Sequence, residues 1–534
     1  MDFRFGLRKL RSAFRVPPRL SAPKRRRAVP QRAVDPKRTL WLDRKGTAVR
    51  GAAQLRRTKI VCTIGPASSD VAVLEKMMRT GMDVARLNFS HGTHESHSAT
   101  LLKIRQAARQ VGKHVAILQD LCGPKIRVGE MPGGAVVLNE GQEVTFQADV
   151  PPAGEILPVE YDDLAKDVKA GDRILFDDGN LEARVLWVKG PHVRVRFVRA
   201  GKLKSRKGMN LPGVKISAPS VTEKDLQDLE WGLANEVDYV ALSFVRAPED
   251  LAPVRKRLEK IDDPPMLVSK IEQPEAVACL EEILRASDAV MVARGDLGVE
   301  MDFAEVPLIQ KRLIRMANAL DIPVITATQM LESMTACPRP TRAEASDVSN
   351  AILDGTDAVM LSGETASGQY PVEAVEAMAS IALRTERNMF APGSDHSFKG
   401  REAHVETLHD ALALGAEMIA RHLDICAIAV ATLSGDTAKF VASARPRIPI
   451  VGISSNLKGV RRMALYWGVI PYQCKPFRKP GDAMIYGREA ILELGLGHLG
   501  DKMMLAVGRG PSREFAARLH IHEIGAESDP DKSC

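Results

Sequence analysis

This chain of 534 residues has no closely spaced pair of cysteines and no long apolar run. Its seven cysteines are scattered and odd in number, and none forms a C-x-x-C pair. This usage indicates a reducing compartment and argues against a zinc site or a disulfide framework. No uninterrupted apolar run reaches membrane length, so we expect a soluble protein with no membrane partner. At this length we expect about three domains.

Acidic residues are scarce at the start of the chain. Residues 1–57 contain 18 Lys and Arg but three Asp, a net charge of +15, which leaves −7 for the rest of a chain whose total is +8. No helical or strand period is sustained there, so we expect a basic, disordered extension. Contact with nucleic acid, an organelle transit peptide and an anionic partner are its functional interpretations. A solvated tail and a start codon placed too early are the alternatives.

From Lys59 onward a pattern repeats, in which a short apolar run rich in β-branched residues ends in polar residues or glycine before a helical stretch. The eight runs are 59–66, 83–90, 114–120, 238–244, 265–272, 288–296, 322–328 and 357–364. The clearest helical stretches are 71–79, 98–110, 274–285, 306–320 and 342–353. Eight such units predict an α/β fold, a (β/α)8 TIM barrel, with its chemistry at the C-terminal ends of the strands.

Two parts of the chain fall outside this pattern. Much of 126–237 alternates short strands with Gly and Asp turns, which predicts a small β-barrel domain inserted as a lid that excludes water. After about residue 386, helices and strands alternate again, which predicts a doubly wound α/β domain. The expected division is a basic extension (1–57), a catalytic barrel (58–128 and 219–387), an inserted lid (129–218) and a C-terminal regulatory and oligomerisation domain (388–534).

Two strings at strand ends carry the most chemistry. In 266–272, MLVSKIE, the i, i+2 rule of a strand places Lys270 beside Glu272. In 288–300, DAVMVARGDLGVE, the same rule places Arg294 beside Asp296. Two carboxylates next to a lysine suggest a divalent metal that holds an anionic substrate. A pair of surface salt bridges is the simpler interpretation.

The other strand ends add cations, carboxylates and hydroxyl groups. Arg86 suits a phosphate, because its planar fork binds oxygens bidentately. The remaining candidates are Asn88, Ser90, Asp120, Lys125, Arg127, Ser243, Gly295, Thr326, Thr328, Ser362 and Glu364. Together, these side chains at the mouth of the predicted barrel fit metal-assisted chemistry on a small phosphorylated acid. Their oxygen ligands favour Mg²⁺ or Mn²⁺ over zinc.

Nine motifs in order give the chain a family resemblance. They are TKIVCTIGP, ARLNFSHG, GPKIR, KGMNLPG, SKIE, ARGDLGVE, ATQMLESM, PRPTRAEASDV and MLSGETASGQYP. Together they resemble pyruvate kinase from about residue 58 to the C-terminus. The resemblance implies a phosphotransferase that moves the phosphoryl group of phosphoenolpyruvate to ADP, giving pyruvate and ATP in the last step of glycolysis.

The resemblance also implies roles for matching positions at the phosphoryl group. Glu272 and Asp296 would bind the divalent metal. Lys270 would stabilise the transferring phosphoryl group and the developing enolate. Arg86 and Arg127 would bind phosphoryl oxygens, which is the positioning and charge neutralisation that such a transfer needs.

Further roles follow from the same resemblance. Lys207, in the inserted segment, would join Arg86 and Arg127 at the nucleotide phosphates. Thr328 would lie near the enolate carbon, where Ser362 and Glu364 support proton delivery through a water relay. The backbone N–H groups of Gly295 and Asp296 would hold the substrate carboxylate, with Ser243 also contacting the substrate.

One departure from the family concerns a monovalent cation. Potassium-dependent members carry glutamate where this chain has Lys125, and usually threonine where it has Leu121. Because a lysine ammonium supplies the same positive charge, we predict that K⁺ is not required, although Asn88, Ser90 and Asp120 still match potassium ligands. The alternative is that Lys125 pairs with Asp120 or another acid and has no catalytic meaning.

A loop in the C-terminal domain has two interpretations. Thr432, Ser434, Gly435 and Thr437 match an effector loop of sugar-phosphate-activated relatives. Asp436 lies inside the loop, and its charge would oppose a phosphate. An ordinary strand-to-helix turn with an N-cap is the alternative.

Two other classes of function remain open from the residues. A Mg²⁺-dependent carbon–carbon lyase on a related barrel would also use strand-end Glu and Asp, but would not need a lid or Lys207. A binding role for the basic extension, on nucleic acid or an anionic surface, would be an addition, since nothing in the barrel requires it. Family resemblance implies a homotetramer, and we expect a cytoplasmic protein, with organelle import through the extension as the alternative.

Overall fold

The computed structural model describes residues 40–42, 48–50, 55–148, 150–152, 154–391, 408–479, 481–508 and 518–525. Most of the predicted basic extension lies outside these residues. In its described part, β1 (Leu40–Leu42) and β2 (Ala48–Arg50) form a two-stranded sheet. No helix in the described ranges has the length and apolar character needed to cross a membrane.

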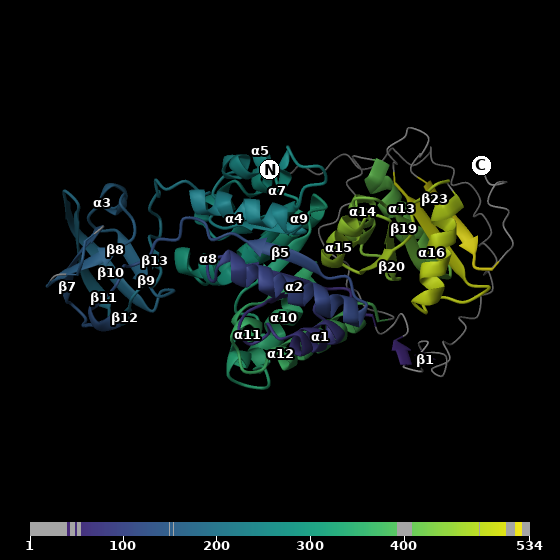
Figure 1. Cartoon of the computed structure of the whole chain (residues 1–534), viewed down its shortest axis with the longest axis horizontal. Coiled ribbons are helices and arrows are strands. Elements are labelled where there is room, and N and C mark those ends of the chain that lie inside the picture. Colours follow the sequence, from purple (N-terminus) through teal and green to yellow (C-terminus); the bar gives the residue numbers. More distant parts are fainter. Residues whose placement is uncertain are drawn as a thin grey trace, which may run out of the picture. The chain divides into compact units, whose positions relative to one another are not determined.

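Eight parallel strands close into a barrel, which confirms the predicted fold (Figure 1). In chain order they are β3 (Lys59–Thr63), β4 (Val84–Asn88), β5 (Ala116–Asp120), β14 (Tyr239–Leu242), β15 (Met266–Ile271), β16 (Ala289–Ala293), β17 (Val324–Ala327) and β18 (Ala358–Leu361). Each lies within one of the eight predicted runs. The barrel closes where β18 pairs with β3.

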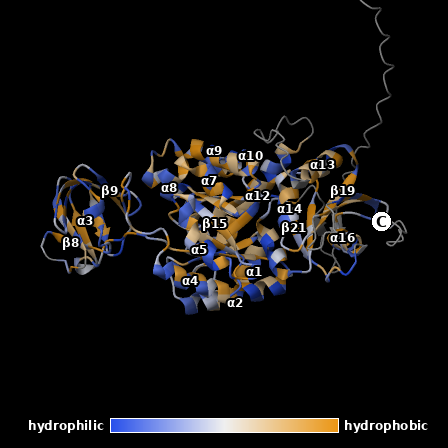
Figure 2. Cartoon of the chain, turned by 90° about the horizontal axis from the view of Figure 1, so that it is seen from above, coloured by the Kyte–Doolittle hydropathy of each residue, from blue (hydrophilic) through white to orange (hydrophobic). Residues whose placement is uncertain are grey.

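Alternation along each strand builds two apolar layers. Val61, Val268 and Met360 point into the barrel, whereas neighbours such as Ile60 and Val290 pack outward against the helices. Figure 2 shows the resulting orange strand β15 among helices whose outer faces carry blue. The surrounding helices are α1 (Val71–Thr80), α2 (His94–Val111), α4 (Glu223–Ala234), α5 (Ala252–Leu258), α6 (Pro274–Ala278), α7 (Leu280–Arg285), α8 (Arg294–Glu300), α9 (Val306–Ala319), α10 (Arg342–Asp354), α11 (Gly363–Ala366) and α12 (Pro371–Met389).

The segment between β5 and β14 forms a separate β structure. Its elements are β6 (Ala135–Leu138), β7 (Glu143–Ala148), β8 (Ile156–Val159), α3 (Leu164–Asp167), β9 (Arg173–Phe176), β10 (Leu181–Lys189), β11 (His192–Arg199), β12 (Gly201–Lys204) and β13 (Met209–Asn210). Six strands pair in the order β13-β9-β10-β11-β7-β8, and β12 pairs with β6. Phe146, Phe176 and Phe197 stack in its core, with ring centroids 5.2 and 5.5 Å apart.

The C-terminal part is a five-stranded sheet in the order β21-β20-β19-β22-β23, which confirms the predicted second α/β pattern. Its elements are α13 (Leu408–His422), β19 (Ile425–Ala431), α14 (Asp436–Ser443), β20 (Ile450–Ser454), α15 (Leu457–Arg462), β21 (Val469–Gln473), α16 (Gly481–Glu493), β22 (Lys502–Val507) and β23 (Arg518–Glu523). The antiparallel edge strand β23 was not predicted. Hydrogen bonds tie this part to the barrel, including Tyr239 Oη to Arg462 O at 2.7 Å.

Candidate active site

A chain of buried polar side chains lies at the C-terminal ends of adjacent barrel strands. Lys270 Nζ lies 2.8 Å from Glu272 Oε1, 3.3 Å from Asp120 Oδ1 and 2.7 Å from Ser243 Oγ. Asp120 Oδ2 in turn accepts from Arg86 Nε at 2.7 Å. The predicted proximity of Lys270 and Glu272 is confirmed. Each charge in this cluster has an opposite charge within hydrogen-bond reach, so the geometry is fixed before any ligand arrives.

Thr63 is a member of this cluster that sequence reasoning missed. Its hydroxyl oxygen accepts from Arg86 Nη1 at 2.9 Å and donates to Leu361 O at 3.0 Å. Thr63 and Arg86 are register partners on β3 and β4. Only the strand register identifies this contact, because a threonine at the end of a strand is ordinary in itself.

The charges of the cluster shift the pKa values of its members. Burial acts to lower the pKa of Lys270, but Asp120, Glu272 and Asp296 outweigh it and raise that pKa. Burial acts to raise the pKa of Asp120, but Lys270 and Arg86 hold it below its usual range. For Glu272 burial prevails, with Asp296 adding to it, and the pKa is raised despite the opposing charge of Lys270. The ammonium is therefore held charged, while burial and the Asp296 charge act against the charged form of Glu272.

Asp296 supplies the second carboxylate at this place. Within the described residues, its carboxylate has no hydrogen-bond or ion-pair partner, and its charge acts on both Lys270 and Glu272. No three His, Cys, Asp or Glu side chains of the described ranges gather into a group that could hold a metal by themselves. Two carboxylates, of which Glu272 pairs with a single ammonium and Asp296 has no described partner, fit a hard divalent cation that takes its other ligands from substrate and water, as Mg²⁺ usually does.

The predicted placement of Arg294 beside Asp296 on a strand is wrong. Strand β16 ends at Ala293, and both residues belong to helix α8, where positions two apart point in different directions. Arg294 instead donates from Nη1 to both carboxylate oxygens of Asp347, at 2.8 and 2.7 Å, and from Nη2 to Thr328 O at 2.8 Å. It anchors the loop after β17.

Thr328 and Gly295 meet across this part of the rim. The Gly295 N–H donates to Thr328 Oγ1 at 2.7 Å, and that hydroxyl donates to Ala327 O at 2.7 Å. Thr328 and Gln329 have φ values of 64° and 54°, which is costly for a β-branched residue such as Thr328. The strain ends β17 abruptly and turns the Thr328 side chain toward the amide of α8.

Ser362 and Glu364 lie at the end of β18. Glu364 is fully buried and accepts from the backbone N–H of Ser362 at 2.7 Å and of Leu331 at 3.1 Å. The Ser362 hydroxyl oxygen is buried and has no hydrogen-bond partner among the residues that the structure describes. An unsatisfied buried hydroxyl beside a buried carboxylate is consistent with a place that a water molecule completes.

The residues expected at the cation position are divided between two rim loops. Asn88 and Asp120 are register partners on β4 and β5, and Asn88 Oδ1 accepts from Ser90 N at 3.1 Å. Leu121 is buried. Lys125 forms no ion pair among the described residues, so its expected alternative pairing with Asp120 is not seen; Asp120 is paired with Arg86 and Lys270 instead.

Cations from the barrel rim and the inserted segment lie together. Arg127 and Gly208 form an isolated β-bridge, and Arg127 Nη1 donates to Arg206 O at 3.1 Å. A Cβ atom on Gly208 would lie 3.2 Å from Lys125 Cε. Lys207 Nζ is 2.5 Å from Asp177 Oδ1. Partial burial and the charges of Arg127, Lys125 and Arg86 lower the pKa of the nearby His91.

The candidate effector loop lies elsewhere, between β19 and α14. Thr432 Oγ1 accepts from Gly435 N at 3.0 Å, and Ser434 Oγ donates to Asp436 Oδ2 at 2.6 Å. Gly435 has a φ of 101°, a conformation that favours glycine. These contacts within the loop are compatible with both interpretations from the sequence.

Comparison with known proteins identifies the family. Residues 55–375 match the model of the pyruvate kinase barrel domain, and residues 410–517 match the pyruvate kinase alpha/beta domain. A pyruvate kinase of Geobacillus stearothermophilus is 46% identical over 461 residues, 85% of this chain and 78% of the relative. One from Staphylococcus epidermidis is 44% identical over 480 residues, 89% and 81% of the two chains.

These matches favour the kinase over the carbon–carbon lyase. They extend over the barrel and the C-terminal sheet, and the first spans the inserted segment with Lys207. The chain therefore belongs to the pyruvate kinase family, a phosphotransferase family, and transfers the phosphoryl group of phosphoenolpyruvate to ADP.

Proposed function

We propose that the reaction takes place at the buried chain of Arg86, Asp120, Lys270 and Glu272, with Asp296 beside it. The observation that carries this proposal is the buried Lys270 ammonium, which lies 2.8 Å from Glu272, 3.3 Å from Asp120 and 2.7 Å from Ser243. Its position is fixed by Ser243 and Glu272, so it meets the developing negative charge without rearranging. Such preorganised charge is the largest contribution to catalysis of this kind.

In this proposal Glu272 and Asp296 bind the divalent metal, Mg²⁺ or Mn²⁺. The raised pKa of Glu272 and the absence of a described partner for Asp296 support it. A bound divalent cation supplies charge neutralisation for oxygens of the substrate. Arg86 binds the phosphoryl oxygens, and Lys270 stabilises both the phosphoryl group and the enolate oxygen left behind.

The other half of the reaction is protonation of the enolate. In our proposal the N–H groups of Gly295 and Asp296 hold the substrate carboxylate, and Ser243 contacts the substrate. Thr328 lies near the enolate carbon, which receives its proton through water from the Ser362 and Glu364 side. The unpartnered Ser362 hydroxyl supports such a relay.

For the nucleotide, we propose that Arg86, Arg127 and Lys207 bind the ADP phosphates. The bridge between Arg127 and Gly208 keeps Arg127 and Lys207 close, which supports a shared role. Lys207 would exchange Asp177 for phosphate oxygens when residues 129–218 close as a lid. The remaining segments, 58–128 with 219–387 and 388–534, then form the catalytic barrel and the C-terminal domain.

We also propose that the enzyme does not require K⁺. Lys125 lies on the loop after β5, and its charge contributes with Arg127 to the field on His91, which supports a cationic rim. Turnover should be the same when all K⁺ is replaced by tetramethylammonium. The matched variant Lys125→Glu should become dependent on K⁺; a large loss of wild-type rate in tetramethylammonium contradicts the proposal.

The remaining assignments concern the oligomeric state, regulation and the cellular compartment. We propose a homotetramer in the cytoplasm, with no role for nucleic acid in the barrel. Mass photometry of the full chain tests the tetramer. The Thr432–Thr437 loop is proposed as an effector loop, and titrating sugar phosphates and AMP against the substrate saturation curve tests it.

The central assignment is tested by Lys270→Met in a coupled assay for ATP formation. We expect a loss of at least about a thousandfold in kcat, since a preorganised charge is removed. Lys311→Met is the matched control, because Lys311 forms an ion pair with Asp354 on the barrel exterior. Retained turnover in Lys270→Met would undo the assignment of the site.

A further inference from the structure

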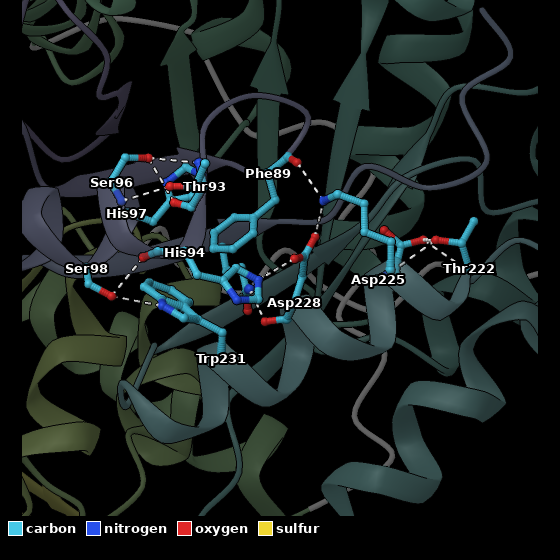
Figure 3. A network of polar contacts seen from close by, with 12 residues as sticks. Phe89, Thr93, His94, Ser96, His97, Ser98, Thr222, Asp225, Asp228 and Trp231 are labelled. Carbon is cyan, nitrogen blue, oxygen red and sulfur yellow. Dashed lines mark hydrogen bonds and ion pairs between the residues drawn. The ribbon is translucent and has the colours of Figure 1, made fainter. Parts of the chain in front are cut away.

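The first turn of helix α4 contacts two loops of the barrel rim, and Figure 3 shows the contact with Phe89. Lys224 Nζ donates to the backbone oxygen of Phe89 at 3.2 Å. The carboxylate of the next residue, Asp225, accepts from the Gly123 N–H at 3.0 Å. Phe89 lies between Asn88 and Ser90 in the chain, and Gly123 lies two residues before Lys125. One helical turn therefore holds both loops on which the cation position is proposed.

Further contacts hold the side chains of both Lys224 and Asp225 in position. Asp225 is 1% exposed and also accepts from the backbone N–H and hydroxyl of Thr222, at 2.8 and 2.6 Å, in the capping box of α4. Lys224 is 59% exposed, but its ammonium lies 2.5 Å from the buried Asp228. The other oxygen of Asp228 pairs with His94 Nε2 at 2.7 Å. Asp228 thus fixes the lysine between itself and Phe89 O.

The side chain of Phe89 is held as firmly as its carbonyl group. Its ring stacks on His97 with centroids 4.1 Å apart and lies 5.0 Å from the ring of Trp231 on α4. Trp231 Nε1 donates to Ser98 Oγ at 3.0 Å (Figure 3). Together with the hydrogen bond from Phe89 N to Asp120 O at 2.9 Å, these contacts hold Phe89 where its backbone oxygen meets Lys224.

Helix α4 also begins directly after the return segment from the inserted β structure. The Arg246 guanidinium donates to Ile216 O at 2.8 Å, Ala218 O at 3.2 Å and Ser220 Oγ at 2.8 Å. The chain between this anchor and the α4 cap is only a few residues long. A rigid path thus runs from the return segment into the turn that holds the rim.

We propose that Lys224 and Asp225 are positioning residues for the nucleotide side of the reaction, with the His94–Asp228 pair holding Lys224 in place. They keep the Asn88–Ser90 and Gly123–Lys125 loops at the spacing that ADP binding needs. This inference rests on the proposed function of the rim loops. It concerns ADP because the loop that Asp225 holds leads directly to Arg127, which is proposed at the ADP phosphates, whereas neither Lys224 nor Asp225 contacts Lys270 or Glu272.

The test is Lys224→Met, with KM and kcat measured separately for each substrate. We expect KM for ADP to rise about three- to tenfold, the effect of losing one charge-assisted hydrogen bond. The KM for phosphoenolpyruvate should stay within about twofold. The melting temperature should fall by only a few degrees, because the buried Asp228 keeps its pairing with His94. Lys224→Arg should restore most of the ADP affinity.

Glu230→Gln is the matched control, since Glu230 forms an ion pair with Arg257 on another face of α4. It should leave both KM values unchanged. An unchanged KM for ADP in Lys224→Met overturns the inference, as does an equal rise in both KM values with a lower melting temperature. Lys125→Ala distinguishes a failure of this inference from a failure of the proposed function of the rim. If Lys125→Ala changes neither the KM for ADP nor the cation requirement, the proposed role of Lys125 fails, whatever the result for Lys224.

Discussion

Lys59 is a buried lysine whose cost to stability can be measured through pH. It is the first residue of β3, is 7% exposed, and donates from Nζ to Val469 O at 2.6 Å. Burial lowers its pKa from 10.5 to about 8, although the charge of Asp83 acts in the opposite direction. A shift of this size corresponds to about 3 kcal/mol.

The direction of the pH dependence of stability follows from whether the folded or the unfolded state binds more protons. Between pH 8 and 10.5, Lys59 is mostly neutral in the folded protein and charged in the unfolded chain, so the unfolded state binds more protons. Stability therefore rises with pH across this window, and below pH 8 the full cost of burying the ammonium is present. Lys59→Met removes the cost, but leaves Val469 O without its donor, which costs about 1 kcal/mol or more.

We therefore expect Lys59→Met to be more stable than wild type by about 1–2 kcal/mol at pH 7, and to lose this advantage as the pH approaches 10.5. The measurement is urea unfolding followed by tryptophan fluorescence at pH 7, 8.5 and 10. Taking the difference between the two proteins removes the titration of groups they share. Lys103→Met, at an exposed position of α2, is the control and should show a difference independent of pH. A flat difference for Lys59→Met would refute the reasoning.

Four further predictions concern charge and metal. Burial acts to raise the pKa of Asp83, but Arg56 and Lys113 hold it well below its usual range, so its contribution is present at neutral pH and lost in acid. Asp83→Asn should cost about 3 kcal/mol in urea unfolding at pH 7 and less at pH 3. Arg294→Lys cannot bind Asp347 and the Thr328 backbone oxygen through separate nitrogens and should lower the melting temperature by several degrees, measured by scanning fluorimetry. EDTA should abolish turnover, and Glu272→Gln should need about tenfold or more Mg²⁺ for half-maximal rate.

The sequence-based prediction succeeded where a local pattern and the strand geometry agree. Eight β-branched runs gave eight barrel strands, and the contact between Lys270 and Glu272 followed from strand alternation. The placement of Arg294 was wrong because the strand was extended beyond Ala293. A carboxylate early in the following segment, Asp296, is a helix-start signal that outweighs the apolar run before it.

Contacts between distant segments could not be predicted in this way. The pair of Lys224 and Asp228 is readable as an i, i+4 spacing on a helix. The contact of Lys224 with Phe89 is not, because the two lie on different barrel units whose relative positions depend on the whole fold. The same is true of Thr63 with Arg86, which depends on strand register.

The insertion between β5 and β14 has a consequence for how the chain folds. These strands are neighbours in the barrel although the inserted segment separates them in sequence. The segment's own ends pair, with Val128 N bonded to Lys207 O and Met209 N to Ile126 O, both at 2.9 Å. Once the insert has folded around its phenylalanine core, its ends lie close together, so pairing β5 with β14 loses little further chain entropy. We therefore expect the insert to form first, and the β5–β14 seam to be the step whose rate falls when the insert is destabilised.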